Sequence, residues 1–150
     1  MFKDGRQKIN KIRNIDLDAA YLAAVTSPSV EAQIIDLNQK QLYEKGIESD
    51  GTRIGDYAQS TIYRKEKYGD AVSGIPGETG HITLNDTGKF YNSMKIEVKG
   101  PAIVITGDME KANDDIEPIY PKALGLTEES ILELVPEVGE RMLVNIKSQL

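Results

Sequence analysis

The sequence predicts an α+β fold, in which N-terminal helices and a long C-terminal helix pack on a small antiparallel sheet. Apolar residues recur at helical spacing between residues 16 and 46, and again from residue 127 to the end of the chain. Between these regions, two short apolar runs flank Gly100-Pro101, as the strands of a hairpin flank its turn. These patterns place helices at both ends of the chain and strands between them.

A chain of 150 residues fits one domain. Residues 1–15 show no clear period and are interpreted as a basic N-terminal arm. Residues 16–150 are interpreted as a single α+β domain. Within this domain, residues 70–80 are rich in glycine and lack a period, which predicts a mobile loop.

Two helices are expected to follow the arm. The first is predicted to be capped by Asp16 or Asp18 and ended by Pro28. The second is predicted over residues 30–45, where apolar residues recur every three or four positions. Gly46 is a natural end for it, because glycine accepts the left-handed backbone conformation.

A small hairpin is expected after the second helix. Asp50-Gly51 is a strong signal for a two-residue turn. Folding at this turn places Glu48 opposite Arg53 and Ile47 opposite Ile54. The hairpin would then have an opposite-charge pair on one face and an apolar pair on the other.

The helix predicted after Ser60 and before Gly69 is rich in tyrosine and lysine. Aromatic rings among cations can stack on nucleic-acid bases. More commonly the rings pack inward while the ammonium groups stay in water. The second arrangement is the one we expect for Tyr57, Tyr63 and Tyr68.

The clearest strands lie in the second half of the chain. Met94, Ile96 and Val98 alternate with charged residues, which predicts a half-buried strand. Residues 102–105 are apolar at every position, as in a central strand. The turn at Gly100-Pro101 predicts that the two strands pair in an antiparallel hairpin.

The last element is predicted to be a long helix that begins at Thr127. Thr127 and Ser130 form a partial cap, and acidic residues in the first turn favour the positive end of the helix dipole. Pro136 is expected to kink the helix or divide it in two. The inward face is predicted to carry Ile131, Val135, Val138, Met142 and Ile146.

Composition excludes several classes of protein. The chain has no cysteine, so a disulfide framework and a cysteine metal site are impossible. The net charge of -6 disfavours a general nucleic-acid binder. No apolar run approaches the ~20 residues of a membrane span, and the N-terminus lacks the apolar core of a signal peptide. We therefore expect a soluble protein, cytosolic when made, with no membrane partner.

The charge is unevenly distributed. Residues 1–15 carry five basic side chains against Asp4 alone, a net charge of +4, whereas residues 108–140 carry ten acidic residues against Lys111 and Lys122, a net charge of -8. Such asymmetry marks either two solvated ends or a contact between subunits or with a partner. In the second case, the contact residues of the arm are Lys3, Arg6, Lys8, Lys11 and Arg13.

The triplet Asp86-Thr87-Gly88 has two interpretations. It can be the catalytic loop of a dimeric aspartic protease, but Lys89 would then disturb two carboxylates that must share a proton. It can instead be a polar turn in which Asp86 or Thr87 accepts backbone N–H groups at the start of a helical turn. Phe90 and Met94, four residues apart, would then both point inward, and Ser93 would close the turn. The second interpretation explains more of the segment.

Other patterns of catalytic chemistry are weak. His81 is the only histidine and reads as a polar residue at the junction of a loop and a strand. The acidic residues between 108 and 117 match no calcium-loop spacing, and the chain has neither a phosphate-binding loop nor a dinucleotide fingerprint. We therefore expect no enzyme, and no catalytic, cofactor-binding or metal-binding residue.

The run LNDTGKFYNSMKIEV resembles a signature of small structural proteins of tailed bacteriophages. These are the virion-morphogenesis and head–tail joining proteins, also called neck or tail-completion proteins. Two further stretches resemble the same family, GIESDGTRIGDYAQSTIYRKEKYG before the signature and IYPKALGLTEES after it. The acidic stretch ANDDIEPIY departs from the family pattern. The residues of the structural motif are Leu84, Asp86, Thr87, Gly88, Phe90 and Ser93.

The resemblance implies a ring-forming virion component at the head–tail interface, hexameric or dodecameric, without catalytic residues or cofactors. Its partners would be further copies of itself and the neighbouring portal, adaptor or tail proteins, while DNA would pass without specific recognition. The protein would lie in the virion, and in the host cytoplasm during assembly. Two alternatives are a tail-tube or minor capsid component, and a small cytosolic binding or regulatory module that uses the arm and residues 57–68.

Overall fold

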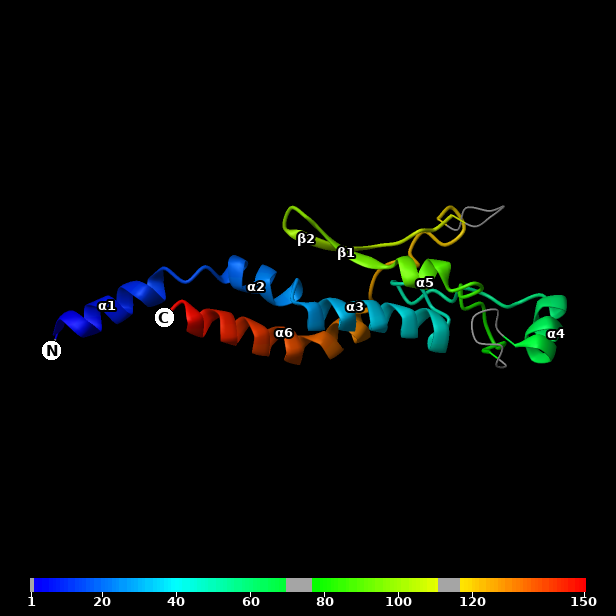
Figure 1. The fold of residues 1–150 in the computed structure, drawn as a ribbon, viewed down its shortest axis with the longest axis horizontal. Coiled ribbons are helices and arrows are strands. Elements are labelled where there is room, and N and C mark those ends of the chain that lie inside the picture. The colour runs from blue at the N-terminus through cyan, green and yellow to red at the C-terminus, as the bar shows by residue number, and fades with distance from the viewer. Residues whose placement is uncertain (1, 70–76, 111–116) are drawn as a thin grey trace. The chain divides into compact units, whose positions relative to one another are not determined.

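The computed structural model describes residues 2–69, 77–110 and 117–150, and for residues 2–5 the backbone alone (Figure 1). These ranges form an α+β fold with a long C-terminal helix and a two-stranded antiparallel sheet, so the predicted fold class is confirmed. The elements are α1 (Phe2–Arg13), α2 (Leu17–Val25), α3 (Pro28–Lys40), the π-helical turn η1 (Gln41–Lys45), α4 (Gln59–Tyr68), α5 (Lys89–Ser93), β1 (Lys95–Lys99), β2 (Ala102–Thr106) and α6 (Glu128–Ser148).

The chain divides into two compact units. Unit 1 comprises Met1–Gln33 and Glu133–Leu150, and unit 2 comprises Ile34–Leu132. Helices α3 and α6 each contribute residues to both units. The single domain expected over residues 16–150 stays a prediction, as does the mobile loop, because residues 70–76 lie outside the described ranges.

Unit 1 is built from helices alone. The Asp16 side chain caps α2 by accepting a hydrogen bond from the Ala19 backbone N–H at 2.9 Å, which confirms the first of the two predicted caps. The Asp16 backbone N–H bonds to Gln149, and the Ser29 hydroxyl bonds to Glu137, so α2 and the start of α3 run antiparallel to the second part of α6. The residues buried along this packing are Ala20, Ala24, Val25, Val30 and Leu134.

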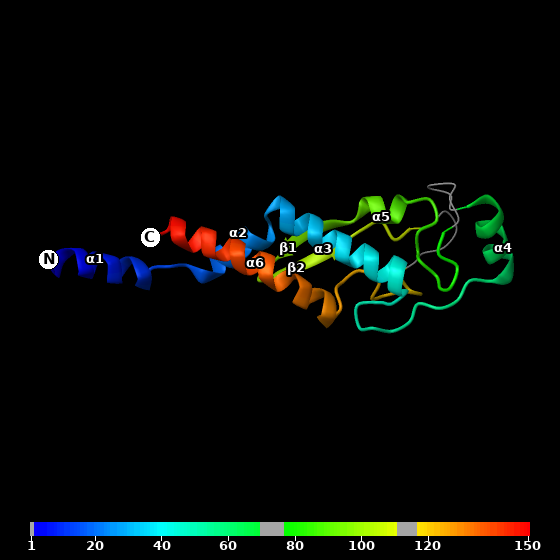
Figure 2. The same ribbon diagram turned by 90° about the horizontal axis from the view of Figure 1, so that it is seen from below.

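The N-terminal arm is helical. Helix α1 covers most of the segment that lacks a clear apolar period in the sequence. Every described side chain from Arg6 to Asn14 is exposed, including Ile9 and Ile12. Figures 1 and 2 both show α1 running on beyond the C-terminal end of α6, where the Lys11 ammonium donates to the Leu150 carbonyl oxygen at 2.6 Å.

Unit 2 holds the apolar core of the fold. Its buried cluster joins the end of the helical region to the hairpin near residue 50, to α5 and to the segment before α6. Thr127 caps α6, since its hydroxyl oxygen accepts from the Ser130 backbone N–H at 3.3 Å. The members of the cluster are Leu42, Ile54, Phe90, Tyr91, Met94 and Ala123.

The hairpin near residue 50 differs from its predicted register by one residue. Ile47 pairs with Arg53 instead of Ile54, and the Glu48 backbone N–H donates to the Thr52 carbonyl oxygen at 2.8 Å. The expected pair of Glu48 and Arg53 does not form, because the Glu48 carboxylate accepts from the Lys122 backbone N–H at 3.0 Å. A contact with a segment distant in sequence therefore determines the register.

The sheet consists of β1 and β2, which pair antiparallel from Lys95 with Thr106 to Lys99 with Ala102. The predicted hairpin at Gly100-Pro101 is confirmed. The expectation that residues 102–105 form a central strand is wrong, because the sheet built by the described residues has two strands. Val98 in β1 is correspondingly exposed, although the alternation of the sequence predicts a buried face.

Helix α6 is continuous through Pro136, so the proline does not divide it. Its buried stripe begins one residue earlier than predicted, whereas Val138, Met142 and Ile146 further along are partly buried, in line with the predicted face. Ser130 and Leu134 are buried, whereas Ile131 and Val135 are exposed. The polar contacts of Ser130 explain this rotation, because its hydroxyl lies between Thr127 and Gln41 inside unit 2.

Candidate functional site

The motif residues 84–88 form a tight turn before α5. Leu84 has a φ of 57°, an uncommon value for a residue with a branched side chain, and it packs on the core of unit 2. Gly88 lies in the left-handed region at the start of α5. The Thr87 hydroxyl oxygen accepts from the Lys89 backbone N–H at 3.3 Å, as the turn interpretation expects, whereas the Asp86 carboxylate faces Arg64 at 3.4 Å.

Phe90 and Ser93 connect this turn to the end of β2. Phe90 and Met94 are both buried in the core, as their spacing predicts. The Ser93 hydroxyl donates to the Phe90 carbonyl oxygen at 2.7 Å and accepts from the Asp108 backbone N–H at 2.7 Å. The Lys89 ammonium lies 2.8 Å from the Asp108 carboxylate and lowers the pKa of that carboxyl. The motif is thus a joint held to the end of β2 by hydrogen bonds and an ion pair.

A hydroxyl network lies beneath the joint. Thr83 is fully buried, and its carbonyl oxygen accepts from the Tyr91 hydroxyl at 2.6 Å. The Tyr57 hydroxyl oxygen accepts from the Thr83 backbone N–H at 3.0 Å and lies 2.9 Å from the Thr83 hydroxyl. Burial raises the pKa of Tyr91 far above its ordinary value.

We expect Tyr91 to stay protonated at about pH 11, where exposed tyrosines ionise. Because the folded-state pKa is raised, its contribution to stability is fully present below the unfolded pKa of about 10 and is lost as pH rises through the folded value. Phenolate absorbance of folded wild-type protein and of Tyr91→Phe measures this. Burial also raises the pKa of Tyr120, so the variant is needed for assignment. If wild type and variant differ by one tyrosine that titrates near pH 10, the expectation is wrong.

Two buried amide side chains hold the segment before α6, and sequence reasoning missed both. Asn38 donates from Nδ2 to the Ala123 carbonyl oxygen at 2.9 Å and accepts from the Gly125 backbone N–H at 3.0 Å. Gln41 donates from Nε2 to the Gly125 carbonyl oxygen at 3.1 Å and accepts from the Thr127 backbone N–H at 2.8 Å. The signal was available, because both amides fall on the apolar stripe of Ile34 and Leu37.

His81 has a structural role at the end of η1. Its Nε2–H donates to the Tyr43 carbonyl oxygen at 2.7 Å, and its ring lies against Gly46, the left-handed residue that ends η1. The residue is buried beside backbone. A carbonyl oxygen can only accept a hydrogen bond, so the proton of this bond lies on Nε2.

Acidic side chains line a hollow of about 510 Å³ in unit 2. Asp108, Glu110 and Glu117 lie around an apolar floor that includes Ile105, Met109 and Leu124. Asp114 and Asp115 fall outside the described ranges. Nowhere in residues 2–69, 77–110 or 117–150 do three or more histidine or acidic residues gather in a group that could hold a metal ion.

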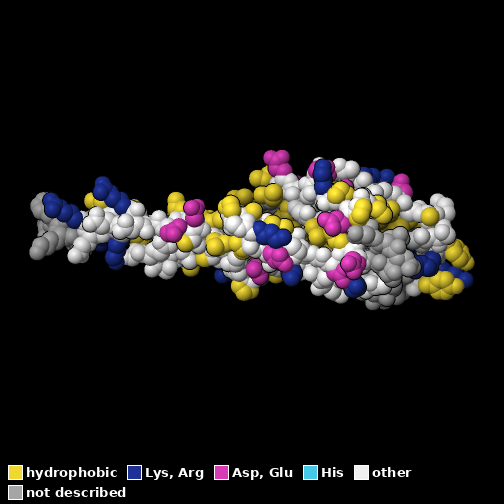
Figure 3. Space-filling view, turned by 90° about the horizontal axis from the view of Figure 1, so that it is seen from above, with side chains coloured by type: hydrophobic (Ala, Val, Ile, Leu, Met, Phe, Trp, Pro, Cys, Tyr) yellow, Lys and Arg dark blue, Asp and Glu magenta, His cyan; other side chains and the backbone are white. Residues whose placement is uncertain are grey.

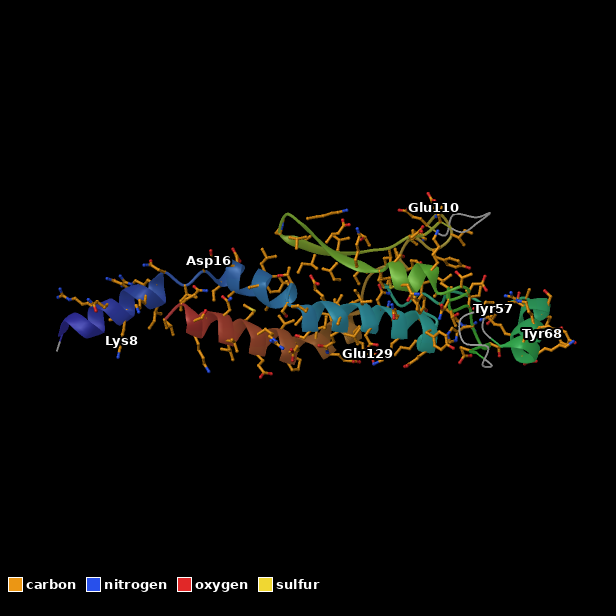
Figure 4. All side chains as sticks on the ribbon, viewed as in Figure 1. Lys8, Asp16, Tyr57, Tyr68, Glu110 and Glu129 are labelled. Atoms are coloured by element: carbon orange, nitrogen blue, oxygen red, sulfur yellow. The ribbon has the colours of Figure 1, made fainter. Side chains whose placement is uncertain are left out.

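The exposed surface is rich in two kinds of side chain. Figure 3 shows Lys and Arg side chains spread along α1, and Lys8 is labelled there in Figure 4. Of the predicted arm contacts, Arg6, Lys8, Lys11 and Arg13 are exposed, whereas the Lys3 side chain lies outside the described part. Large apolar side chains are also exposed in unit 1, namely Ile9, Ile12, Leu17, Tyr21, Leu22, Val135, Leu143, Val144 and Leu150.

The tyrosines of α4 contradict the expectation that their rings pack inward. Tyr63 is 62% exposed and Tyr68 is 64% exposed, and the Lys67 ammonium lies 5.6 Å and 5.0 Å from the two ring centroids. Lys65 is the buried residue instead, with its ammonium 4.9 Å from the Tyr57 ring. The helix therefore presents aromatic rings and a cation to solvent (Figure 4).

No protein-family model, curated protein or solved structure matches this chain. Over the residues that the structure covers, a helix with the length and apolar character of a membrane span is not found. The described surface thus combines hydrogen-bonded turns with exposed apolar and basic side chains.

Proposed function

We propose that this chain is a structural protein of a tailed-bacteriophage virion, a ring-forming connector subunit, neck or tail-completion protein, at the head–tail interface. The observation that carries the proposal is the exposed apolar surface of unit 1. Monomeric proteins rarely leave so many large apolar side chains in water unless they mark an interaction site. A subunit that completes its packing by assembly accounts for this surface.

The motif that resembles the phage family supports the proposal in a second way. The Leu84–Ser93 turn and the Ala123–Thr127 segment are both fastened by buried hydrogen bonds. Rigid joints of this kind hold surface elements in fixed directions, as a ring requires of each subunit.

The expected partners are copies of the same chain in a hexamer or dodecamer, and the portal, adaptor or tail proteins on either side. The net charge of the whole chain is -6, and the arm carries +4, so residues 16–150 carry -10. An acidic lumen would repel the phosphate backbone, so DNA would pass without specific recognition. A neutral or basic lumen would contradict this part of the proposal.

The proposal is tested by the mass of purified protein from light scattering, followed by negative-stain electron microscopy of the same sample. Closed rings of six or twelve subunits are the expected result. A chain that stays monomeric, both alone and when mixed with the portal and tail proteins encoded beside its gene, would contradict a connector role.

A binding or regulatory module is the alternative favoured by one observation, the exposed rings of Tyr63 and Tyr68 beside Lys67. Stacking on a base contributes about 1–3 kcal/mol per base. Fluorescence anisotropy with a single-stranded oligonucleotide separates the two functions, because a connector subunit is expected to bind it weakly and without dependence on these tyrosines.

A further inference from the structure

Helix α1 packs on no apolar surface among the described residues of its own chain. It has 12 residues, and every described side chain is exposed, with Ile9 at 52% and Ile12 at 58%. Isolated helices of this length are marginal in water even with good helix formers, because tertiary packing supplies most helical stability. A helix in this state gains order by lying on another surface.

The side chains of α1 indicate the chemistry of that surface. Ile9 and Ile12 lie three residues apart and form a short apolar ridge. Arg6 precedes Ile9 by three positions and Arg13 follows it by four, so two guanidinium groups lie along one edge of the ridge. The matching surface is an apolar strip bordered by carboxylates.

Helix α6 carries such a strip in unit 1. Pro136 and Leu143 are exposed on one side of the helix with Gly139 between them, and Glu133 and Glu140 lie alongside at helical spacing. Both glutamates are exposed, and neither forms an ion pair with a described residue. By contrast, Glu137 on the same helix pairs with Arg141 at 3.0 Å.

Gly139 is the most informative residue of the strip. A glycine in a helix interior costs about 1 kcal/mol relative to alanine. Outside the neighbouring residues and the backbone of its own helix, a methyl group built at Gly139 would meet no described atom within 4 Å. Packing within the chain therefore does not require glycine here, whereas a close approach by a second helix would.

We propose that helix α1 of one copy docks on the Glu133–Leu143 strip of α6 in a second copy of this chain. Ile9 and Ile12 would pack over Gly139 and Leu143, while Arg6 and Arg13 would face Glu133 and Glu140. In its own chain α1 extends past the end of α6, with Lys11 at Leu150, which leaves the strip open to a neighbour. The inference deepens the proposed assembly of copies and rests on it, because it names the surfaces that join them.

Charge reversal tests the pairing. Arg6→Glu/Arg13→Glu and Glu133→Lys/Glu140→Lys are each expected to weaken self-association at least about tenfold, because like charges then meet. Mixing the two variants in equal amounts is expected to restore association, since each supplies the partner of the other. Sedimentation velocity over a range of concentrations measures this. Glu44→Lys/Glu66→Lys is the matched control, because it makes the same charge change at exposed positions on η1 and α4.

Gly139→Gln separates a role in association from a role in folding, because the two roles predict different changes in thermal stability and in association. The variant is expected to raise the midpoint of thermal unfolding, because glutamine favours the helix, and to weaken association by blocking the close approach. A variant that unfolds more readily, or that associates like wild type, would overturn the role of this strip.

Each failure has a distinct meaning. Wild-type rings that persist unchanged in every variant would overturn the α1–α6 contact and leave the connector proposal standing. Wild-type protein without self-association would overturn the contact, and the connector role would then depend on mixing with portal and tail proteins. If Arg6→Glu/Arg13→Glu loses binding to duplex DNA while association is unchanged, α1 is a nucleic-acid contact and the inference is wrong.

Discussion

Gly46→Ala is expected to lower the free energy of unfolding by about 3 kcal/mol. Gly46 has a φ of 63°, in the left-handed region that a side chain disfavours. Its Cβ would also lie 2.3 Å from Cδ2 and 2.4 Å from Cγ of the His81 ring. The ring has little freedom to move, because its Nε2–H is bonded to the Tyr43 carbonyl oxygen.

Urea denaturation followed by circular dichroism measures this loss, and Gly51→Ala is the matched control. Gly51 has a φ of 82°, but a methyl group there meets nothing within 4 Å. Its alanine variant should lose only the conformational term, about 1–2 kcal/mol. Adding His81→Ala to Gly46→Ala should recover part of the loss. Equal losses for the two glycines would show that the close contact with His81 does not matter.

Gln41→Leu is expected to cost about 2–6 kcal/mol, since it leaves two backbone groups of unit 2 unpaired at about 1–3 kcal/mol each. These groups are the Thr127 N–H and the Gly125 carbonyl oxygen, which Gln41 bonds at 2.8 Å and 3.1 Å. Gln41 is only 1% exposed, so water does not replace the lost partners. Leucine is similar in size to glutamine but cannot form hydrogen bonds, so the substitution isolates the loss of hydrogen bonding.

The neighbouring variant Lys40→Ala is the control for Gln41→Leu. Lys40 forms an exposed i,i+4 pair with Asp36 in the same helical turn, and its loss should change stability by less than about 0.5 kcal/mol. Chemical denaturation of both variants gives the comparison. A Gln41→Leu protein as stable as the Lys40→Ala protein would mean that the amide contacts contribute nothing net.

Local patterns in the sequence predicted the elements well where a single residue controls the backbone. Asp16 caps α2, Gly46 ends η1 in the left-handed region, and Gly100-Pro101 joins β1 to β2. In each case the deciding interaction lies within five residues of the one that the pattern identifies. The same holds for Thr87 in the motif turn.

Errors arose where a distant segment decides the outcome. The Lys122 backbone N–H bonds to the Glu48 carboxylate, and the register of the hairpin differs by one residue from the prediction. The Ser130 hydroxyl bonds to Gln41, so Ser130 is buried in place of Ile131 at the start of α6. The roles of Asn38 and Gln41 could not be predicted from neighbouring residues, because their hydrogen-bond partners are distant in sequence. Asn38 and its acceptor Ala123, for example, are 85 residues apart. The exposure of Tyr63 and Tyr68 could likewise not be predicted, because the residue pattern of one helix does not show which other segments cover it.

The amide contacts of Asn38 and Gln41 also affect how the backbone exchanges its hydrogens with solvent. The N–H groups of Gly125 and Thr127 lie outside the regular helices and strands, yet their acceptors are buried in unit 2. Their release requires opening of the core, whereas the N–H groups of α1 need only local fraying of an exposed helix. We therefore expect slow hydrogen exchange at Gly125 and Thr127, in an irregular segment, and fast exchange in α1, a complete helix.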